Sequence, residues 1–248
     1  MFVVAQISDL HFRNSDPEQL ARVDAVMRYL NDRCGGPSAI DALLVTGDLA
    51  DDGLPGQYEE AAAHVITEIP TLTLLGNHDD RIAYHGGLQP VNNSLLLDGL
   101  LLLGLDSSIP GRQDGELTET TLAWASEQIE AAGDVPVLIA FHHPPIDVGM
   151  PFMDSIRQLD PSGFEAFVRR HQNIVGLVCG HIHSPSATTF AGVPLVTAPG
   201  VSSTLNLPFE GDDVLNDTQP PGIAFHFIDD TGRLTTHFRS VRLGQGTP

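Results

Sequence analysis

The 248-residue chain contains no lysine. All twelve of its basic residues are arginines, and 32 acidic residues outnumber them, so the formal net charge is −20. A surface this acidic repels the phosphate backbone of nucleic acids and the head groups of anionic membranes. We therefore expect neither polymeric nucleic acid nor a membrane as a partner, and we interpret the charge as a contribution to solubility.

Cysteine and long apolar runs are also scarce. Cys34 and Cys179 are too few for a disulfide framework, and we expect two reduced, buried thiols. The first apolar run has no basic residue before it and stops at Asp9, which is unlike a signal peptide. The longest apolar stretch, 95–105, is shorter than the about 20 residues that span a bilayer. These absences predict a soluble, cytoplasmic protein.

The sequence does have enough apolar content for a large core. Hydrophobic residues make up 42% of the chain, and no internal repeat or low-complexity segment interrupts it. We expect one domain over residues 1–248. Two long loops, 144–161 and 201–221, are candidates for a cap or substrate wall and for a contact surface, because long loops in compact domains are often functional.

Apolar runs of strand length alternate with helical patterns. The expected buried strands are Phe2–Ser8, Ala42–Thr46, Thr71–Leu75, Val135–Phe141 and Ile174–Cys179. The expected helices are Pro17–Arg33, Glu59–Glu68, Glu119–Ala132 and Gly163–His171, the third between an N-cap at Thr118 and a stop at Gly133. This alternation predicts an α/β fold.

Further short strands follow one another without helices between them. They are Thr188–Ala191, Leu195–Thr197, Gly222–Ile228 and Leu234–Arg239. They indicate antiparallel pairing in a second sheet. The fold class that accommodates both patterns is a four-layer α/β/β/α sandwich of two mixed sheets flanked by helices.

Each of the five buried strands ends in a short polar motif. The motifs are Asp9-Leu10-His11, Gly47-Asp48, Gly76-Asn77-His78-Asp79, His142-His143-Pro144-Pro145 and Gly180-His181-Ile182-His183. Any one of them alone is more typical of a turn than of a site. Because ligands of open α/β sheets bind beyond the carboxyl ends of the strands, the ordered set is expected to converge.

The converging side chains suit two divalent metal ions. A carboxylate such as Asp48 can bridge two ions, and the Asn77 carbonyl is a neutral ligand that limits the negative charge. Mixed oxygen and imidazole ligands favour Mn, Fe, Co or Zn over Ca or Mg, without selecting one of them. Two such ions can clamp an in-line displacement and supply a bridging hydroxide that attacks phosphorus. The sequence thus predicts hydrolysis of a phosphate ester.

At this point the motifs are recognisable as a family pattern. Their order resembles that of the calcineurin-like metallophosphoesterases, from the first strand to about Pro199. The segments Ile7–Arg13, Gly76–Asp80, Asp106–Ser108 and His142–Pro145 look more closely like the class III cyclic-nucleotide phosphodiesterases. The bacterial glycerophosphodiesterases of the same branch share that pattern.

The resemblance implies roles for individual residues. One metal would be held by Asp9, His11, Asp48 and His183, and the other by Asp48, Asn77, His142 and His181. His78 would lie beside the phosphoryl group as the catalytic histidine, while His143 would be structural or support a ligand. From their positions next to the motifs, Arg13, Asp79 and Asp106 are further candidates for contacting substrate or orienting an imidazole, although capping or solvent exposure explains each of them about equally well.

Three functions remain open at this stage. The first is hydrolysis of 3′,5′-cyclic nucleotides, cyclic AMP foremost, to 5′-nucleotides, which rests on the closer resemblance. The second is a glycerophosphodiesterase or a phosphodiesterase of broad specificity for small diesters. The third, a metal-dependent interaction module without turnover, is disfavoured because no ligand position is missing. A homodimer built on the C-terminal loop is compatible with the sequence but has no support in it.

Overall fold

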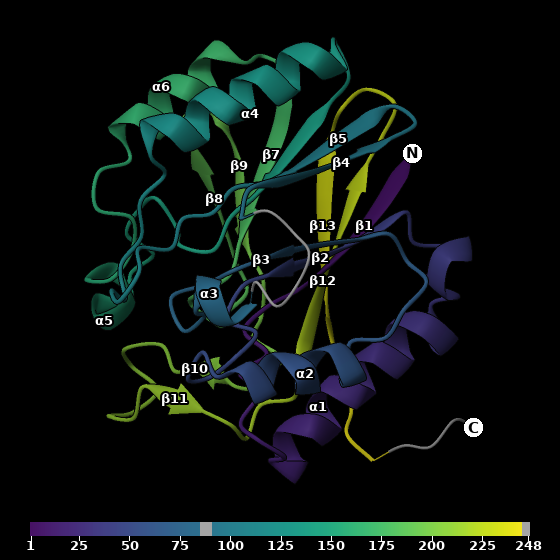
Figure 1. Ribbon diagram of the computed structural model, residues 1–248, viewed down its shortest axis with the longest axis vertical. Helices are drawn as coiled ribbons and strands as arrows, with labels where there is room; N and C mark the ends of the chain where they lie inside the picture. Colours follow the sequence, from purple (N-terminus) through teal and green to yellow (C-terminus); the bar gives the residue numbers. More distant parts are fainter. Residues whose placement is uncertain (85–90, 245–248) are drawn as a thin grey trace.

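Two β-sheets stacked face to face form the centre of the molecule, and helices cover both outer faces (Figure 1). The structure is a computed structural model that describes residues 1–84 and 91–244. The expected α/β/β/α sandwich of two mixed sheets is confirmed. No helix within these described residues is both long and apolar enough to cross a membrane.

The first sheet has five strands in the order β13-β12-β1-β2-β3. Its strands are β1 (Phe2–Ile7), β2 (Ala42–Thr46), β3 (Thr71–Leu74), β12 (Gly222–Ile228) and β13 (Leu234–Ser240). β1, β2 and β3 are parallel, β12 pairs antiparallel with β1, and β13 pairs antiparallel with β12. The carboxyl ends of the three parallel strands therefore lie along one edge.

The second sheet has six strands in the order β4-β5-β6-β7-β9-β8. Its strands are β4 (Asn93–Leu97), β5 (Leu100–Gly104), β6 (Val137–Ala140), β7 (Ile174–Cys179), β8 (Ser186–Phe190) and β9 (Val193–Thr197). The four central strands are parallel, and β4 and β8 pair antiparallel at the edges. A small separate hairpin of β10 (Thr204–Leu205) and β11 (Leu215–Asn216) lies in the C-terminal loop.

The helices form the outer layers. Against the first sheet pack α1 (Pro17–Arg28) and α2 (Pro55–His64); against the second pack α4 (Glu119–Ala132) and α6 (Ser162–Arg170). Two short helices, α3 (Arg81–Tyr84) and α5 (Pro151–Asp154), follow motif segments. Thr118 caps α4 as expected, since its hydroxyl accepts the Thr121 N–H at 3.2 Å, and Gly133 ends it.

Several elements differ from the sequence-based expectation. The strands β12 and β13, expected in the second sheet, belong to the first, where β12 pairs with β1. The first helix stops at Arg28 and continues as a π-helix, η1 (Tyr29–Arg33), before a 3₁₀ turn, η2 (Gly36–Ser38). The second begins at Pro55 instead of Glu59, because proline is favoured in the first helical turn. The apolar stretch 95–105 belongs to the β4–β5 hairpin, whose turn is Asp98-Gly99. An Asp-Gly pair between apolar runs is a hairpin signal, and it was available in the sequence.

A buried polar network joins the two sheets. The Gln6 amide donates to Thr46 Oγ1 at 2.9 Å and, across the interface, to the Cys179 carbonyl at 3.0 Å. Gln6 Oε1 then accepts from His226 Nε2 at 2.9 Å, and His226 Nδ1 accepts from Thr236 Oγ1 at 2.8 Å. His226 is fully buried, and this burial lowers its pKa to about 3. The network is satisfied by a neutral imidazole.

Candidate metal centre

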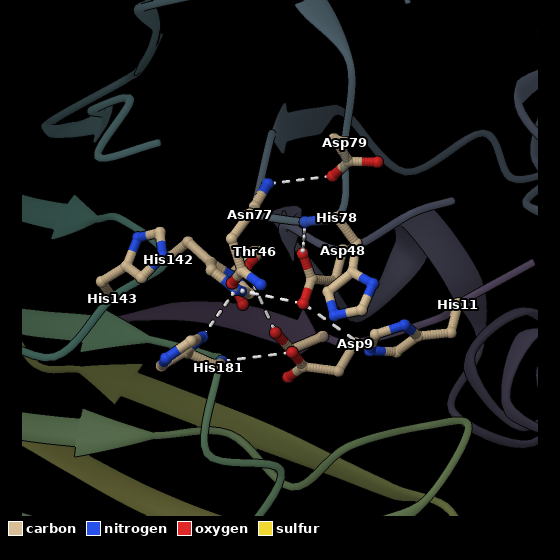
Figure 2. Close-up of polar contacts among 12 residues, drawn as sticks. Asp9, His11, Thr46, Asp48, Asn77, His78, Asp79, His142, His143 and His181 are labelled. Atoms are coloured by element: carbon tan, nitrogen blue, oxygen red, sulfur yellow. Dashed lines mark hydrogen bonds and ion pairs between the residues drawn. The ribbon is translucent and has the colours of Figure 1, made fainter. Parts of the chain in front are cut away.

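The five polar motifs meet where the carboxyl ends of the parallel strands of both sheets come together. The first sheet brings Asp9 and His11 after β1, Asp48 after β2 and Asn77 after β3. The second brings His142 after β6 and His181 and His183 after β7. In Figure 2 the side chains of Asp9, Asp48, His142 and His181 point toward one centre. The sandwich thus brings together side chains up to 174 positions apart in sequence, from 9 to 183.

One cluster contains Asp9, His11, Asp48 and His183, all buried, with donor atoms within 4.8 Å of one another. His11 Nε2 lies 3.2 Å from His183 Nε2 and 3.6 Å from Asp48 Oδ2. His183 Nε2 is 3.4 Å from Asp9 Oδ1. These are the four residues that the family resemblance assigns to one metal.

A second cluster is centred on His142. Its Nε2 lies 3.3 Å from Asp48 Oδ2, 3.2 Å from Asn77 Oδ1 and 3.3 Å from His181 Nδ1. Asp48 Oδ2 is therefore close to an imidazole of each cluster. This position between the two clusters is where a bridging carboxylate would lie.

The outer ring nitrogen of each of these four histidines is bound to an oxygen that can only accept. The acceptors are Asp51 Oδ1 for His11 (2.9 Å), Thr46 O for His142 (2.7 Å), Ile156 O for His181 (3.1 Å) and Ser203 O for His183 (3.2 Å). The outer nitrogen therefore carries a proton, and the inner one faces the centre, where it can give its lone pair to a metal ion. Such outer partners are typical of metal-binding histidines, because they fix the tautomer and the ring orientation.

Facing ring nitrogens and an orphaned oxygen make the centre suited to cations. The inner nitrogens of His11 and His183 are only 3.2 Å apart, and those of His142 and His181 are 3.3 Å apart. Asp9 Oδ2 is buried and has no hydrogen-bond partner. Buried polar atoms are normally satisfied, and bound cations would satisfy both the facing nitrogens and the Asp9 oxygen. The residues present thus fit two divalent metal ions.

The electrostatics of the centre support the same conclusion. Burial raises the pKa of Asp9 to about 6. Burial would also raise the pKa of Asp48, but the His142 and His11 imidazoles hold it well below its usual range. Despite burial, Asp48 raises the pKa of His142 to about 9. The carboxylate charge that retains a proton on His142 is the charge that would attract a divalent cation in its place.

The backbone at the centre is held in an uncommon conformation. Asp9, His11, Asp48, His181 and His183 have φ values of 58°, 46°, 51°, 70° and 50°. Residues other than glycine seldom adopt positive φ, and such strain concentrates at functional sites. It turns side chains only two residues apart, as in both Asp-x-His and His-x-His, into one centre.

Close backbone packing beneath the centre requires glycine. A Cβ atom at Gly76 would lie 2.1 Å from Asp48 Oδ1, and one at Gly180 would lie 2.0 Å from Ser8 Oγ. The glycine that precedes Asn77 therefore leaves the space that the Asp48 carboxylate occupies. We conclude that these motif glycines are needed for approach and not only for turning.

His78 lies at the mouth of the centre and, unlike the candidate ligands, is solvent-exposed. Its backbone N–H donates to Asp48 Oδ1 at 2.9 Å, and its Nδ1 donates to the Asp51 carbonyl at 2.7 Å. Although burial lowers it, the pKa of His78 is raised overall by Asp48 and Asp51. Its Nε2 is the ring atom left to meet a substrate.

Asp51 is a site residue that sequence reasoning missed. Its carboxylate accepts from His11 Nδ1 and from Arg13 Nε (3.2 Å), while its carbonyl holds His78. It therefore orients both a candidate ligand and the candidate catalytic histidine. The available signal was its position three residues after Asp48, in the same strand-end segment.

The other candidates have different partners from those expected of an imidazole-orienting acid. Asp79 accepts the backbone N–H groups of residues 49, 50 and 76, at 3.1, 2.9 and 2.9 Å, and so fastens the loops after β2 and β3 together. Asp106 pairs with Arg81 at 2.6 Å. His143 is buried with both nitrogens engaged, by the Ser107 hydroxyl (2.8 Å) and the carbonyl of residue 113 (3.2 Å). One of its nitrogens lies within 4.8 Å of nitrogens of His142 and His181, although both of its nitrogens already have these partners.

Comparisons with known proteins identify the family of the chain. Residues 2–185 match the family model of the calcineurin-like phosphoesterases. The chain belongs to this family. It is 30% identical over 243 residues to a glycerophosphodiester phosphodiesterase of Enterobacter lignolyticus, covering 90% of this chain and 86% of that protein. It is 29% identical to a cAMP/cGMP dual-specificity phosphodiesterase of Mycobacterium tuberculosis, over 83% and 69% of the two chains.

A solved structure shares the fold. The crystal structure of a dimetal phosphatase from Danio rerio superposes with a TM-score of 0.65 at 14% identity, covering 97% of this chain and 99% of that one. The family and the named relatives together define the chain as a metal-dependent phosphodiester hydrolase. Its His/Asp clusters are able to bind the metals that this chemistry needs.

Proposed function

We propose that the protein hydrolyses 3′,5′-cyclic nucleotides, cyclic AMP foremost, to 5′-nucleotides at a dinuclear centre held by the seven residues of the two clusters. The observation that carries the dinuclear assignment is Asp48 Oδ2, 3.6 Å from His11 Nε2 and 3.3 Å from His142 Nε2. A relative with cyclic-nucleotide specificity in its name supports the substrate. A cyclic nucleotide is a diester with one negative charge, which suits a chain of net charge −20.

The two long loops support a walled substrate site. The loop 144–161 is fastened to the centre because His181 Nε2 donates to the Ile156 carbonyl, and the loop 201–221 because His183 Nδ1 donates to Ser203. Met150, Met153 and Leu205 from these loops pack on Ile182, which lies between the two histidines. We infer that both loops form walls of the substrate site.

An exposed aromatic side chain on the first wall could stack against a base. Of the aromatic residues near the motifs, Phe12 is fully buried and cannot do so, whereas Phe152 on α5 is 53% exposed. Base–aromatic stacking contributes about 1–3 kcal/mol per base. We therefore assign Phe152 as the platform for the nucleobase.

Two bound divalent ions would supply a deprotonated water and Lewis acidity at the phosphoryl oxygens. The protein's own residues do the rest. His78 is fixed by the Asp51 carbonyl so that its Nε2 can donate a hydrogen bond to the phosphoryl group or to the departing ester oxygen. The outer partners of the four ligand histidines keep their rings aimed inward, so the site is organised before substrate arrives.

Substitutions at Asp48 and His78 test the centre separately. We expect Asp48→Ala to lose metal and turnover together, whereas His78→Ala retains both ions and loses roughly 10²–10⁴-fold in kcat. Bound metal is measured by elemental analysis beside kcat on an activated aryl diester, with His171→Ala, a half-buried histidine at the end of α6, as control. An Asp48→Ala protein that kept both ions and near-full turnover would refute the ligand assignment.

The competing function is a glycerophosphodiesterase or a broad-specificity small-molecule phosphodiesterase, which the relative of 30% identity favours. The deciding measurement is kcat/KM for cyclic AMP and for a glycerophosphodiester on the same manganese-loaded protein. Phe152→Ala should lower kcat/KM for cyclic AMP by about tenfold or more, because the stacking on the base is lost, and should leave kcat/KM for the glycerol ester unchanged. Preference for the glycerol ester, with no effect of Phe152, would replace our proposal with this alternative.

The homodimer also stays a proposal. Phe209 in the C-terminal loop is 82% exposed and offers an apolar contact, but Glu210, Asp212 and Asp213 beside it would repel their copies. Association through this loop should therefore strengthen with salt. Sedimentation velocity at low and high ionic strength, with Phe209→Ser beside the wild type, measures it; a monomer under both conditions would exclude this dimer.

A further inference from the structure

A cavity of about 270 Å³ opens on the outer face of the first sheet, beside the end of α1. It lies far from the candidate metal centre along the same strand: Val3 near the start of β1 lines the cavity, whereas Asp9 follows the end of β1. Nothing in the proposed reaction uses it.

Aromatic side chains from three elements line this cavity. Tyr29 comes from η1, Phe225 and Phe227 from β12, and His237 from β13. The rings of Phe227 and His237 meet edge to face, with centroids 5.3 Å apart at 89°. The π-helical turn contributes Tyr29, and π-turns inside helices are frequent at functional sites. Such walls favour a flat aromatic ligand.

The charge at this cavity is opposite to that of the protein as a whole. Among the lining residues the only full charge is the Arg239 guanidinium, and none of them is acidic. Burial raises the pKa of Cys34, another lining residue, and the guanidinium groups of Arg33 and Arg239 oppose this rise, so both cations act here. The nearest acidic residue in sequence is Asp41, which follows the lining residue Ile40 but does not itself line the cavity. Its carboxylate accepts the Val3 N–H at 2.7 Å.

We propose that this cavity binds a small aromatic anion, an aromatic ring that carries a carboxylate, sulfonate or phosphate. The ring packs against Phe225, Phe227 and His237, and the anionic group lies against Arg239. Apolar lining with one well-placed polar group is the usual composition of a small-molecule site. The chain has a net charge of −20, so the cationic guanidinium of Arg239 at this cavity supplies the selectivity for an anion.

The test uses 1-anilinonaphthalene-8-sulfonate as probe, on the full-length metal-loaded protein. We expect enhanced emission on binding, with affinity reduced about tenfold by Arg239→Ala, which corresponds to one charge-assisted hydrogen bond. Arg242→Ala removes the same charge from an exposed site outside the cavity and should leave the affinity unchanged. The neutral analogue N-phenyl-1-naphthylamine should not distinguish the Arg239 variant from the wild type.

Cys34 gives a second readout that does not depend on fluorescence. It lines the cavity, whereas Cys179 is fully buried, so a thiol reagent reports on Cys34 first. Saturating probe should slow the labelling of Cys34 in the wild type and not in Arg239→Ala. Binding that ignores Arg239 and leaves the labelling rate unchanged would locate the probe elsewhere and overturn the proposal, as would the absence of any binding.

Discussion

Acidification should destabilise this protein in part through a single histidine. His226 is fully buried, and its neutral ring is engaged by Gln6 and Thr236. Its folded-state pKa is lowered to about 3 by burial, whereas an unfolded histidine titrates near 6.5. The unfolded chain therefore binds the proton first. The stabilising contribution is fully present above pH 6.5 and is lost as the pH falls toward 3.

The magnitude follows from the two pKa values. Each pH unit between them corresponds to about 1.4 kcal/mol, so the full loss is about 5 kcal/mol, of which about 2 kcal/mol falls between pH 7 and pH 5. His226→Gln removes the titrating group but keeps an amide that can donate to Gln6. The variant should cost about 1–3 kcal/mol at pH 7 from imperfect hydrogen bonds, and this deficit should shrink by about 2 kcal/mol at pH 5.

Urea unfolding at pH 7, 6 and 5 measures this difference, with the fluorescence of the single tryptophan, Trp124, as signal. Both proteins are freed of metal with a chelator, so that acid release of ligands does not add to the slope. His237→Gln, an exposed histidine on the neighbouring strand, is the matched control. If the wild type and His226→Gln lost stability in parallel, within about 0.5 kcal/mol, His226 would be charged in the folded state and the reasoning would fail.

Two further predictions concern the metal centre. Asp51→Asn should weaken metal binding or activity by about 10–100-fold, because an amide cannot accept from both His11 and Arg13 as the carboxylate does. Asp52→Asn is the control. Equal metal affinities of the two variants in a titration would contradict the role of Asp51 in orienting His11. Gly76→Ala should lose bound metal while the protein stays folded, since its Cβ would lie 2.1 Å from Asp48 Oδ1, an oxygen of the proposed bridging carboxylate. Full metal occupancy by elemental analysis would show instead that the loop can move aside.

The convergence of the motifs within each sheet could be predicted because it depends on strand direction alone. Once Asp9 and Asp48 are recognised as residues that follow parallel buried strands, the sheet edge fixes their neighbourhood without knowledge of any contact, whereas the approach of His142 depends on how the second sheet stacks on the first. The helix capped by Thr118 was predictable for a similar reason, since a cap is a local interaction.

What the sequence could not supply are the interactions made between segments. In the sequence Asp51 is indistinguishable from an acidic residue in a turn, and only the structure shows that its carboxylate accepts from His11, 40 positions away. Asp79 was a candidate both for orienting an imidazole and for capping a turn, and it accepts three backbone N–H groups, from residues 49, 50 and 76. The π-turn after Arg28 depends on how α1 packs at its end, which the three- to four-residue apolar periodicity does not record. Side-chain partners are determined by the tertiary structure, whereas the strands and their order can be predicted from the apolar pattern of the sequence.

The positive φ angles at five candidate ligands have a consequence for laboratory evolution. A left-handed conformation costs an L-residue about 1–2 kcal/mol, so these positions together hold about 5–10 kcal/mol, comparable to the net stability of a typical domain. Glycine removes that cost at each of them. A library selected for heat resistance alone should therefore enrich glycine at Asp9, His11, Asp48, His181 and His183. Its most heat-resistant members would be those that have lost their candidate metal ligands and with them the activity.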